Sequence, residues 1–110
     1  MKVFNKTKNI YISQDLKEAT SISDKLFGMI KNSNQSGLII ETRFGIHTFF
    51  LKKAIDVIIL NDHGKVVKLA SILPNKLFFW NPKYSQVLEL PKGTIKKTKT
   101  AVGNYLLFQS

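Results

Sequence analysis

The stretch GIHTFFLKKAIDVIILNDHGKVVKL, residues 45–69, decides the fold. Its later part places two apolar runs on either side of Asn-Asp-His-Gly, and these turn residues tolerate a positive φ. We therefore predict a β-hairpin over residues 55–69. Residues 46–51 and 54–60 are also strand-like, with Lys52-Lys53 between them, and this pattern predicts a second hairpin.

Asp56 lies inside an apolar strand, where a carboxylate needs a partner because unpaired burial is costly. If the second hairpin turns at Lys52-Lys53, His47 lies diagonally from Asp56, and a one-residue slip places Thr48 opposite it instead. One interpretation is a functional pair, with His47 as a base or ligand-binding group. The other, which we favour, is a structural carboxylate held by a histidine, a threonine hydroxyl or backbone N–H groups.

Short strands dominate the rest of the chain. Apolar or β-branched runs predict strands at 3–4, 10–12, 38–40, 87–90 and 105–108. A capping box at Ser21 and Asp24, followed by apolar residues at helical spacing, predicts an α-helix over about residues 21–32. Thr94 is expected to cap a further short helical turn. The fold class is therefore α+β, mainly β: a small barrel or sandwich of short strands with one packed α-helix.

Length and composition predict one domain over residues 1–110. The chain has 44% hydrophobic and 22% charged residues, enough to bury a single core. It has no cysteine, which excludes disulfides and thiolate metal sites. No apolar run approaches the roughly 18 residues of a membrane helix, and the N-terminus lacks a signal-like apolar run. We therefore expect no membrane insertion and a cytoplasmic location.

Several segments, taken in order over roughly residues 15–108, resemble the domain of unknown function 192 family, a small prokaryotic family. They are Gly28-Met29, Gly45 to Phe49, Ile55 to Val57, and Leu88 to Gly93. The chain departs from the family pattern at Leu51, Ala54 and Gly103-Asn104. The resemblance implies a compact mainly-β domain with one packed helix, and it implies no function.

The formal charge of +10 raises the possibility of a polyanionic partner. All but one of the 17 basic residues are lysine, whereas base reading and bidentate phosphate contacts favour arginine. The basic cluster near the C-terminus has no acidic residue after Glu89 to offset it, and it consists of Lys92, Lys96, Lys97 and Lys99. We favour a solvated face here, with weak, sequence-nonspecific nucleic-acid binding as the alternative.

The run Leu77-Phe78-Phe79-Trp80 is the chain's densest aromatic stretch. Strand alternation turns Phe78 and Trp80 to one face and Phe79 to the other. Exposed rings beside Lys76 and Lys83 can stack on bases or sugars, but in a small β-domain we favour packing.

No complete catalytic set, metal-ligand spacing or phosphate loop is present, so we predict no cofactor and no metal. The leading hypothesis is a non-enzymatic module that binds a small molecule or a protein. Its candidate ligand-binding residues are His47, Thr48, Asp56, Trp80 and Tyr84. Besides nucleic-acid binding, a second alternative is an enzyme that uses a His47/Asp56 pair.

Overall fold

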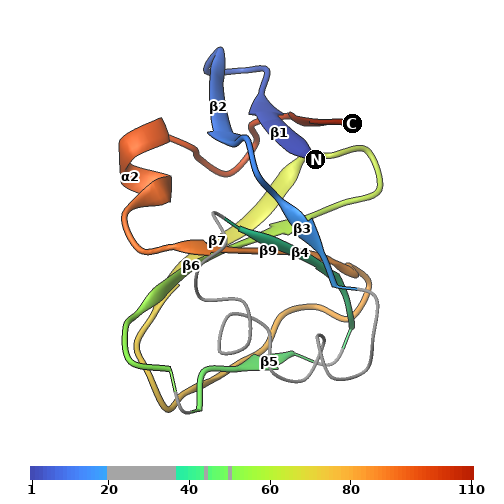
Figure 1. Ribbon diagram of the computed structural model, residues 1–110. Coiled ribbons are helices and arrows are strands. Elements are labelled where there is room, and N and C mark those ends of the chain that lie inside the picture. The colour runs from blue at the N-terminus through green and yellow to red at the C-terminus, as the bar shows by residue number, and fades with distance from the viewer. Residues whose placement is uncertain (20–36, 44, 50) are drawn as a thin grey trace.

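The computed structural model describes residues 1–19, 37–43, 45–49 and 51–110 (Figure 1). The helix that the sequence predicts over about residues 21–32 lies outside the described residues. The described elements are β1 (Lys2–Asn5), β2 (Ile10–Ser13), β3 (Lys17–Glu18), β4 (Leu38–Glu41), β5 (Ile46–His47), β6 (Ile55–Leu60), β7 (Val66–Ile72), β8 (Leu77–Phe78), β9 (Gln86–Pro91), α2 (Thr94–Thr98) and β10 (Leu106–Gln109). The predicted α+β, mainly β class is confirmed.

A five-stranded sheet in the order β3-β4-β9-β6-β7 forms the centre of the fold. Strand β6 is buried along its whole length and pairs antiparallel with both β7 and β9. The side-chain oxygen of Asn61 accepts the backbone N–H groups of His63 and Lys65, each at 2.9 Å, which closes the β6–β7 turn. Gly64 supplies the positive φ that this turn needs. The predicted hairpin over residues 55–69 is confirmed.

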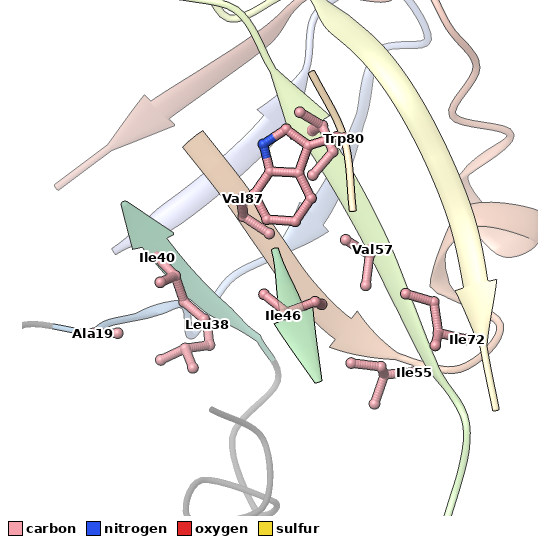
Figure 2. Packing of buried hydrophobic residues seen from close by; sticks show 10 residues of the cluster. Ala19, Leu38, Ile40, Ile46, Ile55, Val57, Ile72, Trp80 and Val87 are labelled. Atoms are coloured by element: carbon pink, nitrogen blue, oxygen red, sulfur yellow. The ribbon is translucent and has the colours of Figure 1, made fainter. Parts of the chain in front are cut away.

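The side chains of β6 alternate between two cores, one on each face of the central sheet. Ile55, Val57 and Ile59 belong to the first core, whereas Ile58 and Leu60 belong to the second. Figure 2 shows the first core, in which residues of β6 meet side chains from β4, β5 and β9. Strand β6 carries apolar residues on both faces because each face packs against one of the two cores.

The second core is covered by a three-stranded sheet and by α2. The sheet has the order β10-β1-β2, and we call it the N-terminal sheet. It contributes Val3 and Leu106 to the second core, while Ile95 of α2 packs against that core. Strand β1 pairs antiparallel with β10, so residues 2–5 lie against residues 106–109. The strands predicted near both ends of the chain are thus confirmed.

On the other side of the central sheet, β5 and β8 pair antiparallel into a two-stranded ribbon. In Figure 1 β5 lies below the central strands, while α2 and the N-terminal sheet lie above them. The expected hairpin between residues 46–51 and 54–60 is therefore wrong, because β5 pairs with β8 and β6 pairs with β7 and β9. The described strands divide among three sheets and form layers, not a closed barrel. No helix within the described ranges is long and apolar enough to span a membrane.

Candidate functional site

Asp56 caps the N-terminus of α2 from a distant strand. Its Oδ2 accepts the N–H groups of Gly93 at 3.1 Å and Ile95 at 2.8 Å, while its Oδ1 accepts the hydroxyl of Ser71 at 2.6 Å. Helix starts leave N–H groups without partners, and the residue at the cap position here is Gly93, which has no side chain to offer. The carboxylate of Asp56, 1% exposed, takes over that role. Thr94, the expected cap, instead donates its hydroxyl to the carbonyl of Pro91.

His47 lies on the opposite side of the central sheet from Asp56. Its neighbour Ile46 belongs to the first core, whereas Asp56 alternates with Val57 and faces α2. The Nδ1 of His47 accepts the N–H of Phe49 at 3.3 Å, and the two rings stack 5.2 Å apart. The expected juxtaposition of His47 with Asp56 is thus wrong, and the hypothesis of an enzyme using that pair loses its geometric basis.

The C-terminal end of α2 is also fixed, by a network of hydrogen bonds between hydroxyl and amide groups. The Asn5 amide donates to Thr100 Oγ1 at 3.1 Å and to Asn104 Oδ1 at 3.0 Å. The hydroxyls of Thr98 and Thr100 lie 2.7 Å apart, and Thr98 donates to the Thr94 carbonyl at 2.8 Å. Because Thr98 and Thr100 are buried, this chain fixes the C-terminal end of α2 to β1.

The basic cluster that the sequence identifies lies on and beside this anchored helix. Its four lysines are exposed, and Lys99 ends the helix in the left-handed region with φ of 55°. The cluster consists of Lys92, Lys96, Lys97 and Lys99. Its ammonium groups therefore extend into solvent from a helix that is fixed at both ends.

Thr48 is a fully buried connector and not a surface group. Its hydroxyl donates to the Leu73 carbonyl at 2.7 Å and accepts the Lys76 N–H at 2.9 Å. Its backbone N–H also donates to the Lys76 carbonyl at 2.9 Å. Thr48 thereby ties the end of β5 to the loop that precedes β8.

Trp80 and Tyr84 belong to the first core or its edge. The ring of Trp80 is 8% exposed and lies with Ile46 and Val87 in the first core (Figure 2). Its indole N–H donates to the Tyr84 carbonyl at 2.7 Å, so the polar group of the buried ring is satisfied. The Tyr84 side chain packs against the same core. The preference for packing is correct for Trp80 and wrong for Phe79, which is 59% exposed.

One face of the ribbon is buried and the other is open. Ile46 and Phe78 are opposite each other in the β5–β8 pair, and both pack into or against the first core. The next pair, His47 and Leu77, points the other way because successive side chains of a strand alternate. Leu77 is 58% exposed.

Two phenylalanines extend this open face. Phe49 stacks on His47 and is 38% exposed. Phe79 is 59% exposed and its ring lies over Gly45, where an added Cβ would meet the ring at 2.6 Å. We call His47, Phe49, Leu77 and Phe79 the ribbon face. Leu73, which follows β7, is 61% exposed, and its carbonyl accepts the Thr48 hydroxyl.

Sequence reasoning identified His47 but missed the three apolar residues of the ribbon face. Alternation over residues 77–80 placed Phe79 on the opposite face from Phe78 and Trp80, and it places Leu77 on the same face as Phe79. The contact of this segment with β5 had no sequence signal, because the two strands are far apart in the chain and each forms only a two-residue ladder.

Within the described ranges, no three acidic or histidine side chains come together as a group that could hold a metal ion. His63, for example, lies exposed in the β6–β7 turn, away from the ribbon.

Comparisons with known proteins relate the chain to a family whose name assigns no activity. It is 31% identical over 108 residues to a UPF0127 protein of Pyrococcus abyssi, covering 93% of this chain and 92% of that protein. A UPF0127 protein of Pyrococcus horikoshii is 25% identical over 108 residues, with 93% of this chain and 94% of that protein covered. No protein-family model matches the chain, so the resemblance to the domain of unknown function 192 family stays a prediction.

A solved structure supports the fold. A protein of unknown function from Novosphingobium aromaticivorans matches with a TM-score of 0.82 over 98% of this chain and 84% of that one. The two sequences are 13% identical, so this likeness concerns the fold alone.

Proposed function

The chain belongs to the UPF0127 family, and from that premise we propose that it is a non-enzymatic binding module whose contact surface is the ribbon face. The observation that carries the proposal is the open apolar side of the β5–β8 ribbon. Single exposed apolar side chains are ordinary, whereas adjacent ones on one rigid face are typical of interaction sites. Phe49 stacks on His47, Leu77 is opposite His47 in the strand pair, and the Phe79 ring lies over Gly45, two residues before His47.

Several of the sequence-predicted site residues have supporting roles in this proposal. Thr48 holds the loop before β8 in place, and Trp80 anchors the chain beyond β8 in the first core. Their burial makes the ribbon a rigid platform, which lowers the entropic cost of binding. Asp56 takes no part in the contact surface, because it caps α2 on the other side of the sheet.

The test is to map binding on the uniformly ¹⁵N-labelled protein by NMR. A panel of peptides, mono- and disaccharides and oligonucleotides is titrated, and shifted amide signals are assigned. We expect hits to shift the signals of Gly45, His47, Leu77 and Phe79 and to disappear in Leu77→Ser. Leu107→Ser, at an exposed position of β10, is the matched control and should bind normally. Hits confined to other surfaces, or no hit from the whole panel, would contradict the proposal.

A second candidate function is weak, sequence-nonspecific nucleic-acid binding through the lysines of and around α2. The observation that favours it is the double anchoring of α2, through Asp56 at one end and Thr98 at the other. We expect retention on DNA that weakens with salt, with a slope of log affinity against log salt of roughly −0.7 to −0.9 per phosphate contacted. Lys96→Ala combined with Lys97→Ala should reduce the slope, and an affinity that does not depend on salt would contradict this function.

A further inference from the structure

The chain around the ribbon face is strongly basic. Residues 43–85 include seven basic residues and only two acidic ones, Asp56 and Asp62. Asp56 is buried beneath α2, on the other side of the central sheet. Asp62 lies in the β6–β7 turn, at the opposite end of the hairpin from Ile72. Basic side chains therefore outnumber acidic ones by seven to two in the segment that carries the ribbon face.

Two of these cations are positioned at β8. Lys76 is exposed and directly precedes Leu77 in the chain. The ammonium group of Lys68 donates to the Phe79 carbonyl at 3.1 Å and lies 4.8 Å from the centre of the Phe78 ring. Lys68 extends from β7 in the central sheet, so its charge is held beside the ribbon by the fold and not only by the sequence.

The exposed groups suit aliphatic and aromatic side chains better than stacked bases. Base stacking needs free ring faces, and one face of Phe49 is covered by His47. The Phe79 ring lies over Gly45, which covers part of that ring. The remaining large group of the ribbon face is Leu77, which is aliphatic and offers no ring face.

We propose that the ribbon face binds an acidic segment of a partner protein that also carries apolar side chains. This inference rests on the proposed function and names its partner class. The apolar side chains of the segment pack on Leu77 and Phe79. Its carboxylates extend past the edge of β8 toward Lys68, which bonds the Phe79 carbonyl there, and toward Lys76. Apolar contact supplies most of the affinity, while the charges select the partner and speed its association.

The test uses three synthetic peptides that differ in one property each. The first, GDELDFELDG, is acidic and carries apolar side chains. The second, GKKLKFKLKG, has the same apolar pattern with basic residues, and the third, GDESDSESDG, keeps the acidic residues without the apolar ones. A single-stranded DNA of ten thymidines serves as a polyanion that carries no amino-acid side chains. Each is titrated into the ¹⁵N-labelled protein at 50 and 300 mM salt, and shifted signals and Kd values are recorded.

We expect the first peptide to bind the ribbon face and the other three probes to bind at least about tenfold more weakly. Leu77→Ser should weaken the binding of the first peptide by about tenfold, whereas Leu107→Ser should leave its Kd unchanged. Lys76→Glu should weaken it severalfold at 50 mM salt and much less at 300 mM, because salt screens exposed charges. Lys96→Glu makes the same charge change on α2 and should have little effect.

The outcomes separate this inference from the proposed function. Equal binding of the acidic and basic peptides at the ribbon face would overturn the partner class and leave the binding surface standing. Tighter binding of the DNA at the ribbon face would likewise replace a protein partner with a nucleic acid. No ribbon-face shift with any peptide, saccharide or oligonucleotide would overturn both.

Discussion

Replacing Asp56 is the sharpest test of the structural role that we assign to this residue. Asp56→Ala leaves three donors without their acceptor: the hydroxyl of Ser71 and the N–H groups of Gly93 and Ile95. Loss of a helix cap costs about 1 kcal/mol, and one hydrogen bond to a charged group contributes about 1.5–3 kcal/mol. Because Ser71 and Gly93 are exposed and can bind water instead, we expect a total loss of about 3–4 kcal/mol in the free energy of unfolding.

Asp56→Asn separates the shape of the side chain from its charge. The amide oxygen can still accept both N–H groups of α2, and the Ser71 hydroxyl can rotate to accept from the amide nitrogen. A hydrogen bond to a neutral amide is about half as strong as one to a carboxylate, so we expect a loss of about 1–2 kcal/mol in the free energy of unfolding. The asparagine variant should therefore lie between the native protein and the alanine variant.

Urea unfolding followed by tryptophan fluorescence measures these differences, since the chain's single tryptophan, Trp80, is buried in the first core. Hydrogen exchange adds a local readout, and the Ile95 amide should lose protection in Asp56→Ala. Asp62→Asn, at an exposed turn position, is the matched control and should change stability by less than about 0.5 kcal/mol. A loss below about 1 kcal/mol in Asp56→Ala, or equal losses for both variants, would refute the reasoning.

Further substitutions test the supports of the ribbon and of α2. Thr48→Val keeps the shape but removes a buried hydroxyl that bonds Leu73, and we expect urea unfolding to show a loss of about 2–3 kcal/mol. Gly45→Ala forces a side chain into the left-handed region and against the Phe79 ring, so it should cost about 1–2 kcal/mol and shift the Phe79 NMR signals. Asn5→Ala removes two buried hydrogen bonds and should lower the melting temperature while leaving peptide binding at the ribbon face intact.

Local rules predicted the parts of the fold that depend on neighbouring residues. The hairpin over residues 55–69 follows from the turn chemistry of Asn61 and Gly64, which acts over four residues. Alternation correctly separated Phe78 and Trp80 from Phe79, because the side-chain period of a strand needs no knowledge of its partner.

The parts that the sequence did not predict depend on distant residues. Lys52-Lys53 looked like a hairpin turn, but the chain there passes from the ribbon into the central sheet, so His47 and Asp56 end on opposite sides. The donors to Asp56 come from 15 to 39 residues away, and no pattern near Asp56 identifies them. Backbone N–H groups were nevertheless one of the three kinds of partner expected for a buried Asp56, since a buried carboxylate requires donors wherever they come from.

The pairing of β1 with β10 has a consequence for how the protein is made. Residues 2–5 are synthesised about a hundred residues before their partners at 106–109. The Asn5 amide likewise donates to Thr100 and Asn104, which follow it by 95 and 99 positions. Until then a nascent chain can form the β1–β2 hairpin only with the β1 edge also open, which is a template for unwanted association. Such long-range closure also slows folding, so a chaperone that shields this edge during translation should raise the yield of native protein.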